Sequence, residues 1–369
     1  MDQLTAGQGS RVKKALNSYN FTHKKTQYMG LDLKPLITTV PIKLAELSGK
    51  VVAIDAFNTI YQFLSTIRGP TGELLMNGRG EVTSHLSGLF YRNINLLVEN
   101  IKPVYVFDGK MHALKAQEIE RRFKLKQEAV VQYNHALEEG RMEDAVKYGK
   151  RTSVLTDSMV EESKTLLTAL GIPYVQAPAD GEAAAAHLTK TGAAYASASQ
   201  DYDSILFGAK RLVRNLAASG RRKVPGKSTY IDVEPEMVEH DNVLKETGLT
   251  HEQLVDVGIL IGTDFNPSGF SGIGPKTAIK LIKENGRLEN VDKIKGQLAE
   301  VPYQEIRDIF LKPEVPKADG VRFGEVNRER VLDFLCVQKS FSTDRVAGTL
   351  DKLQKAQESR SQSLEKWFG

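Results

Sequence analysis

The amino-acid sequence predicts an α/β fold with a central, mostly parallel sheet flanked by helices. Three short apolar runs, each ending in aspartate, predict strands at residues 51–55, 104–108 and 195–201. Their β-branched and aromatic residues are typical of strands buried on both faces, and helical segments separate them. In open α/β sheets, ligands bind in the crevice beyond the carboxyl ends of the strands. We therefore expect the three terminal aspartates to lie at one crevice.

The first part of the chain alternates between strand and helix. A helix is expected over Ala56–Thr66, and a glycine-punctuated loop over Gly69–Gly80 leads to a second helix and to the strand that ends at Asp108. Residues 110 to about 151 form a charged segment in which Glu118 lies four residues before Arg122, a spacing that supports a helix. The segment has too little apolar surface for a core helix, so we expect it to arch over the end of the sheet.

The second part of the chain contains further helices, one short strand and a basic loop. We expect a helix over Asp157–Leu170, a strand over Ile172–Gln176, an alanine-rich helix from Glu182 to near Gly192, a basic loop over Ser219–Lys227, and two helices over His251–Gly262 and Lys276–Lys283. A tight segment, Gly272-Ile273-Gly274-Pro275, joins the last two helices. Pro275 suits the first position of a helix, where its missing N–H is not needed.

Composition limits the class of protein. The chain has 369 residues, a hydrophobic content of 41% and a formal net charge of +4, which suits one large domain and permits a polyanionic partner if the basic residues cluster. Its one cysteine, Cys336, excludes an intramolecular disulfide and a cysteine-based zinc site. No run approaches the roughly 18 apolar residues of a membrane span, so we expect no membrane partner.

Several acids beyond the strand ends lie at the ends of predicted elements. Together they make seven: Asp55, Asp108, Asp180, Glu182, Asp201, Asp203 and Asp264. Converging carboxylates repel one another unless a cation neutralises them. Their hard oxygen atoms suit Mg²⁺ or Mn²⁺, and two such ions roughly 4 Å apart support phosphodiester hydrolysis. Taken singly, Asp180 could be a helix N-cap and Asp108 a turn former, so the prediction rests on the whole set.

The motifs IDAFNTIYQFL, EVTSHLSGLFYR, KPVYVFDGK, GIPYVQAPADGEAAAA, SQDYDSILFG and GILIGTDF…GIGPKTA resemble the flap endonucleases of the structure-specific 5′-nuclease family, in their archaeal type. The resemblance runs from Met29 to nearly the end. It implies a PIN-like core with a helical arch at about 110–151 and a helix-hairpin-helix element at about 251–285. It also implies an Mg²⁺-dependent enzyme of DNA replication and repair that removes single-stranded 5′ flaps and has 5′ exonuclease activity. The alternatives are another 5′ nuclease of the family, or a non-catalytic protein that binds DNA junctions.

The resemblance also assigns roles to residues. Asp55, Asp108 and Glu182 would hold one Mg²⁺, and Asp201, Asp203 and Asp264 would surround the second, with Mn²⁺ able to substitute. Asp180 stands where the family commonly has Glu. The remaining implied DNA contacts are Lys115 and Arg122 on the scissile phosphate, Tyr61 stacking on a base, Gly30 near the active site, and Gly272, Gly274 and Lys276 on duplex phosphate, with K⁺ at this hairpin. The competing interpretations are a solvated basic helix for Lys115 and Arg122, and a core position for Tyr61.

The two ends of the chain are expected to lie outside the nuclease core of residues 29–349. Residues 1–28 form an extension that precedes Met29, the start implied by the resemblance. We expect residues 350–369 to form a mobile tail with Leu364, Trp367 and Phe368 as a box that binds the sliding clamp PCNA. Ser361 stands where the family usually has Gln. The resemblance implies a monomer that acts in the archaeal cytoplasm or nucleoid, or in a eukaryotic nucleus.

Overall fold

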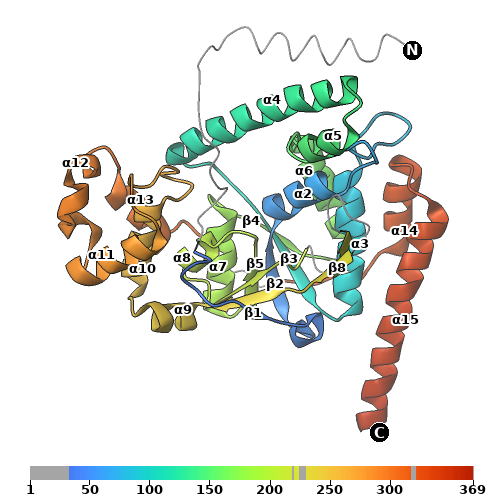
Figure 1. The fold of residues 1–369 in the computed structure, drawn as a ribbon. Coiled ribbons are helices and arrows are strands. Elements are labelled where there is room, and N and C mark those ends of the chain that lie inside the picture. Colours follow the sequence, from blue (N-terminus) through green and yellow to red (C-terminus); the bar gives the residue numbers. More distant parts are fainter. Residues whose placement is uncertain (1–32, 218–219, 224–229, 317–320, 369) are drawn as a thin grey trace.

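The computed structural model describes residues 33–217, 220–223, 230–316 and 321–368. Within these ranges a seven-stranded sheet has the order β1-β9-β6-β5-β2-β3-β4 (Figure 1). Its strands are β1 Val40–Pro41, β2 Val51–Asp55, β3 Lys102–Phe107, β4 Tyr174–Gln176, β5 Ala196–Ala198, β6 Arg211–Arg214 and β9 Glu236–Glu239. The strands from β6 to β4 are parallel, whereas β9 and β1 pair antiparallel. The predicted mostly parallel sheet is confirmed.

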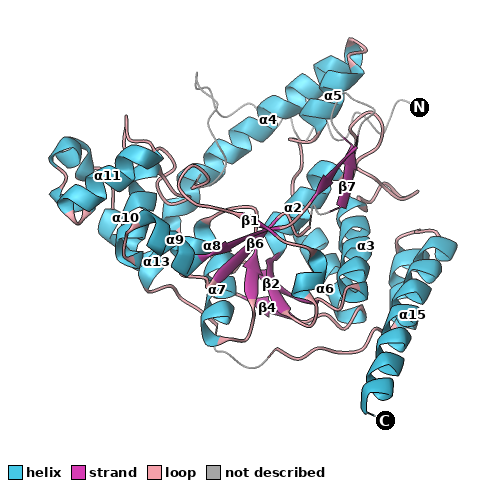
Figure 2. Ribbon diagram, turned by 60° about the horizontal axis from the view of Figure 1, so that its bottom comes forward, coloured by secondary structure: helices cyan, strands magenta, loops and turns pink. Residues whose placement is uncertain are grey.

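Helices surround this sheet, as Figure 2 shows. They are α2 Ala56–Thr66, α3 Ser84–Val98, α4 Ala116–Glu138, α5 Met142–Gly149, α6 Asp157–Ala169, α7 Gly181–Thr191, α8 Asp203–Leu206, α9 His240–Thr247, α10 His251–Ile261, α11 Pro275–Asn285, α12 Lys295–Leu298, α13 Tyr303–Leu311, α14 Arg328–Leu332 and α15 Thr343–Phe368. The helix predicted over Ala56–Thr66 is confirmed at both ends, and Pro275 opens α11 as expected.

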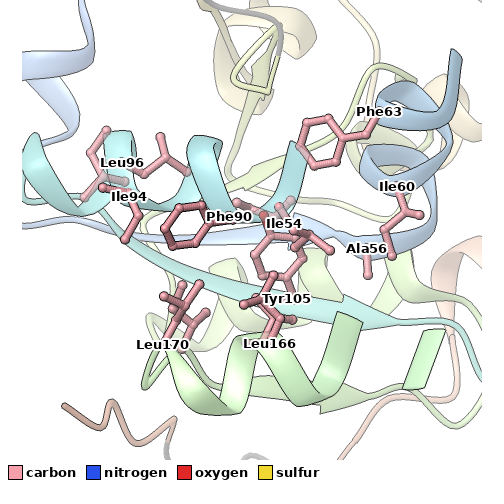
Figure 3. Packing of buried hydrophobic residues seen from close by; sticks show 14 of the residues in the cluster. Ile54, Ala56, Ile60, Phe63, Phe90, Ile94, Leu96, Tyr105, Leu166 and Leu170 are labelled. Carbon is pink, nitrogen blue, oxygen red and sulfur yellow. The ribbon is translucent and has the colours of Figure 1, made fainter. Parts of the chain in front are cut away.

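Both faces of the sheet are buried, which explains the continuous apolar runs. Alternate residues of β2 point to opposite faces. Ile54 packs with Phe90 of α3 and Leu166 of α6, and Figure 3 shows these side chains around Tyr105 of β3. Ala53 belongs to the smaller cluster on the other face, with α7. Side chains on the two faces therefore stabilise the sheet, and the carboxyl ends of its strands remain free for a site.

The charged segment after Asp108 forms the expected arch. Helix α4 crosses above the sheet and packs on α5 (Figure 1). Ala129 and Ala136 of α4 and Ala145 of α5 are buried, and most other side chains of α4 are at least partly exposed. A second apolar cluster joins α10, α11 and α13 to α7, α8, β6 and β9, so the helical hairpin packs against the sheet domain.

Two expectations about irregular segments differ from the structure. In the predicted basic loop, Gly220–Lys223 form β7, which pairs antiparallel with β8, Tyr230–Val233. The expected mobile tail is helical, because α15 continues to Phe368. Its residues Val346, Leu350 and Leu353 are buried in the apolar cluster that includes α3. Their spacing places them on one face of α15, and this face packs against the cluster.

Arg360 gives the tail helix a second anchor. Its guanidinium donates hydrogen bonds to the carbonyl oxygens of Val98, at 2.7 Å, and Leu97, at 3.2 Å. These carbonyls lie in the last turn of α3, where a carbonyl lacks the N–H group that the next turn of a helix would supply. None of the described helices combines the length and apolar character that crossing a bilayer requires.

Candidate active site

Two neighbouring strands deliver the first two acids. Asp55 is the last residue of β2 and also the N-cap of α2, where its Oδ1 accepts a hydrogen bond from the Asn58 N–H at 3.0 Å. Asp108 follows β3, and its Oδ1 accepts from the Gly181 N–H at 2.5 Å. Because β2 and β3 are parallel neighbours, both carboxylates lie at the same end of the sheet.

Helix ends and turns deliver the other acids. Asp180 is the N-cap of α7 and accepts from the Glu182 N–H at 2.9 Å, so its predicted capping role and its place in the site coexist. Asp203 opens α8, two residues after Asp201, and Asp264 follows α10. We call the seven carboxylates the acid cluster: Asp55, Asp108, Asp180, Glu182, Asp201, Asp203 and Asp264.

Burial and mutual repulsion raise the pKa values of most of these acids. Burial and then the charge of Asp108 raise the pKa of Asp55 well above its ordinary value. For Glu182, burial and then Asp203 raise the pKa in the same way. Burial, followed by a neighbouring acid, raises the pKa of both Asp108 and Asp201 to about 6. The causes of these shifts include the charges of the other predicted acids, so the structure places the set close together.

Two cations of the arch contact the acid cluster. Lys115 is the N-cap of α4 and forms a salt bridge with Asp180. Seven residues further along, about two helical turns, Arg122 donates to Asp264 at 2.9 and 3.1 Å. Burial lowers the pKa of Lys115 and of Arg122, but the attraction of neighbouring acids outweighs it and the net shift is upward. Both side chains therefore remain charged in the site.

Glu118 fixes the direction of Arg122. Its buried carboxylate accepts a hydrogen bond from Arg122 Nε at 2.7 Å and two from Arg121 at 2.6 Å. The spacing of Glu118 and Arg122 predicted a helix but did not indicate this orienting contact. Asn58 was missed altogether: its amide Nδ2 donates to Asp201 at 2.9 Å. Its position in the first helical turn, three residues after Asp55, was the available signal.

The acid cluster has the donor chemistry of a site for hard cations. Glu182 Oε1 and Asp203 Oδ1 are buried and accept no hydrogen bond from the described residues. Buried carboxylate oxygens without a donor are costly unless a cation approaches them. Among the described residues, no three His, Cys, Asp or Glu side chains converge as a preformed metal group. The salt bridges described above, together with Asn58, engage the oxygens of Asp180, Asp201 and Asp264.

The remaining predicted residues lie on three other parts of the chain. Tyr61 of α2 is half-buried beneath the arch, with Lys126 Nζ 4.5 Å from its ring centroid. Gly272, Gly274 and Lys276 are exposed at the turn between α10 and α11. Gly272 has a left-handed φ of 76°, a conformation that favours glycine. The clamp-box residues Leu364, Trp367 and Phe368 belong to the end of α15, and Gly30 and the extension 1–28 lie outside the described residues.

Comparisons with known proteins agree with this site. Residues 30–129 match the family model for the XPG N-terminal domain, and residues 171–264 match that for the XPG I-region. Flap endonuclease 1 of Nitrosopumilus maritimus is 57% identical over 340 residues, which cover 92% of this chain and 100% of the relative. The chain belongs to the flap endonuclease family. Flap endonuclease 1 of Thermofilum pendens is 48% identical over 345 residues, with the same coverage.

Solved structures of the family have the same fold. The flap endonuclease-1 from Methanococcus jannaschii superposes with a TM-score of 0.69 and 37% identity, covering 90% of this chain and 100% of that one. The catalytic core of Rad2 in complex with DNA substrate, at 24% identity and a TM-score of 0.60, supports the fold alone. Membership of the flap endonuclease family makes the chain a nuclease that hydrolyses DNA phosphodiester bonds, and metal-dependent catalysis is the norm of this family.

Proposed function

We propose that this flap endonuclease removes single-stranded 5′ flaps during DNA replication and repair, cutting at the junction with duplex DNA. Two Mg²⁺ ions serve the reaction, and Mn²⁺ substitutes for them. The observation that carries the proposal is the acid cluster, in which Glu182 and Asp203 keep buried oxygens without donors and the cations Lys115 and Arg122 stand beside them.

The two groups of acids take different ions. Asp55, Asp108 and Glu182 hold one ion, and Asp201, Asp203 and Asp264 surround the second. Asp180 is one methylene shorter than the Glu common at this position in the family, and it would contribute to holding the metal through a bridging water. When bound, the ions activate a water and stabilise the leaving oxygen. The protein's own acids fix the ions in place and give the site a net negative charge that attracts them.

Lys115 and Arg122 hold the scissile phosphate. In the free protein, Lys115 pairs with Asp180 and Arg122 with Asp264, and these salt bridges keep the two cations next to the acid cluster. A phosphate oxygen is an alternative acceptor for both, and Arg122 keeps its contact with Glu118 while it donates there. These groups stabilise the charge that develops on the phosphate during cleavage. Tyr61 stacks on a base, a contact that contributes roughly 1–3 kcal/mol.

The helical hairpin binds duplex DNA and the tail binds the sliding clamp, and neither takes part in the chemical step. The N-terminus of α11, with Gly272, Gly274 and Lys276, holds a duplex phosphate together with a K⁺ ion, because a helix N-terminus favours anions. Leu364, Trp367 and Phe368 dock on the sliding clamp. The enzyme is a monomer of the archaeal cytoplasm or nucleoid and also has 5′ exonuclease activity.

A cleavage assay with three labelled substrates tests this function. We expect a 5′-flap duplex to be cut at the junction, a nicked duplex more slowly, and single-stranded DNA of the same sequence hardly at all. Omitting Mg²⁺ or adding a chelator should stop all cleavage. Tight flap binding without any cleavage at millimolar Mg²⁺ would instead support the alternative of a junction-binding protein, although all seven acids are present.

A further inference from the structure

Asn58 connects two acids that come from neighbouring strands. Its backbone N–H donates to Asp55 Oδ1 at 3.0 Å, and its side-chain Nδ2 donates to Asp201 Oδ2 at 2.9 Å. Asp55 ends β2, and Asp201 lies three residues beyond the end of β5, the strand that pairs with β2 on the side away from β3. One residue in the first turn of α2 thus holds carboxylates that are far apart in the sequence.

The Asp201 carboxylate is the less constrained of the two. It lies in the turn between β5 and α8, outside regular secondary structure. Two contacts hold the backbone of this turn: the Asp201 N–H donates to Ser199 Oγ at 3.2 Å, and Arg214 Nε donates to the Gln200 carbonyl at 3.1 Å. Neither contact fixes the direction of the carboxylate, which the amide of Asn58 does.

An amide suits this place chemically. It donates to an ionised carboxylate without adding charge, whereas an aspartate at position 58 would add an eighth acid to the acid cluster. A lysine would neutralise the carboxylate that is needed for a cation. The backbone N–H of Asn58 engages one oxygen of Asp55 and its side-chain amide engages one oxygen of Asp201, and the second oxygen of each acid stays available to another partner.

We propose that Asn58 is a positioning residue that orients Asp201 relative to Asp55 so that the two acids bind the metal ions of the site. The inference rests on the proposed metal-dependent function. In metal sites, groups that hydrogen-bond a ligand set its orientation, and removing them weakens metal binding or activity by about 10–100-fold.

The two hydrogen bonds can be separated experimentally. The bond from the backbone N–H to Asp55 is an ordinary N-cap contact, which any residue except proline supplies. Only the bond to Asp201 depends on the side chain. Asn58→Leu keeps a side chain branched at Cγ and removes the amide, and Asn58→Ala removes the amide together with most of the side chain. A merely structural role at the helix start therefore predicts little change in metal binding for either variant.

The decisive measurement is Mn²⁺ binding to the DNA-free protein, followed by electron paramagnetic resonance. We expect both variants to bind Mn²⁺ about 10-fold more weakly than wild type. Binding of the 5′-flap substrate in the presence of a chelator should stay unchanged, because Asn58 does not grip DNA. The matched control is Asn242→Ala, which removes an exposed amide that donates to Glu239 at 3.1 Å, and it should leave Mn²⁺ affinity unaltered.

The outcomes distinguish this inference from the proposed function. Mn²⁺ affinities within twofold of wild type in both Asn58 variants would overturn the positioning role and leave the metal site intact. A wild-type protein that binds no Mn²⁺ would overturn the metal site itself and this inference with it. Thermal melting of each variant, compared with wild type, shows whether it is folded. If Asn58→Ala does not fold, the Mn²⁺ affinity of Asn58→Leu decides the inference.

Discussion

Two buried clusters of charge in this molecule are built in opposite ways. Among the helices α10 to α13, Arg307 of α13 donates to Asp256 of α10 at 2.7 and 3.0 Å and to Glu289 at 2.6 and 3.3 Å. Both carboxylates thus accept hydrogen bonds from the guanidinium. We call these three side chains the Arg307 cluster. In the acid cluster, Lys115 pairs with Asp180 and Arg122 with Asp264, and two buried oxygens accept no hydrogen bond from the part of the chain that the structure describes.

The pKa values reflect how the acids of the two clusters are paired. At Glu289 the hydrogen bonds from Arg307 outweigh burial and the net pKa shift is downward, whereas at the more buried Asp256 they only partly offset burial and the net shift is upward. At Asp108, burial and the neighbouring Asp180 act together and raise the pKa to about 6. The acids of the Arg307 cluster therefore have a cation that offsets burial, whereas the repulsion within the acid cluster costs stability until a cation binds. Opposite responses to mutation should follow.

The largest expected effect is the loss of cleavage in Asp203→Ala. Asp203 is buried and its Oδ1 accepts no hydrogen bond from the described residues, so the variant removes a proposed metal ligand. We expect single-turnover cleavage of a 5′ flap to fall by about three orders of magnitude, equivalent to about 4 kcal/mol. Flap binding, measured by fluorescence anisotropy in Ca²⁺, should be nearly unchanged. Normal turnover at millimolar Mg²⁺ would show that the acid cluster is not the catalytic centre.

The next effect is on stability, in Asp256→Ala of the Arg307 cluster. The variant leaves Arg307 buried with one partner fewer, and breaking a buried pair in this way costs about 3 kcal/mol. Chemical denaturation should show this loss, while cleavage per folded molecule stays the same. The control is Glu252→Ala, which breaks an exposed pair with Arg287 and should cost less than about 1 kcal/mol. Equal losses in the two variants would remove the distinction between this cluster and a surface ion pair.

Lys115→Ala should slow the chemical step by about 100-fold, because it removes the cation that we propose stabilises the charge on the scissile phosphate. Substrate affinity should change much less. Lys124→Ala is the matched control, since Lys124 lies on the same arch helix but pairs with the exposed Glu120. Single-turnover rates at saturating enzyme measure both. A Lys115 variant as fast as wild type would remove this residue from the proposed contact with the scissile phosphate.

The smallest expected effect is a gain of stability in metal-free Asp108→Asn. The folded protein raises the pKa of Asp108 from 3.8 to about 6, so this group's contribution to stability is full below about pH 4 and is lost as the pH rises through about 6. The neutral variant avoids that loss and should be more stable than wild type by about 1 kcal/mol at pH 7.5, about 2 °C in Tm.

The pH dependence supplies the control for this variant. At pH 4 the wild-type carboxyl is protonated in the folded state, so melting curves of variant and wild type should coincide. Added Mn²⁺ at pH 7.5 should stabilise the wild type and not the variant. A variant less stable than wild type at pH 7.5 without metal would contradict the idea that the acid cluster costs stability.

Local patterns in the sequence predicted most of the fold and all the acids. The run 51–55 forms β2, and the spacing of charges after Asp108 predicted the arch helix. The predictions failed where long-range contacts decide local structure. Gly220–Lys223 form a strand because β8 pairs with them, and the polar tail stays helical because Val346, Leu350 and Arg360 contact the region of α3.

The sequence by itself determined which acids stand at the ends of strands and helices, because alternation, capping and turn formation act within a few residues. The family resemblance suggested their chemistry. Only the tertiary structure decided which atoms meet: Lys115 with Asp180, Arg122 with Asp264, and Asn58 with Asp201. These pairs are separated by 65, 142 and 143 residues. Contacts over such separations depend on how the packed strands and helices are placed, which no local pattern encodes.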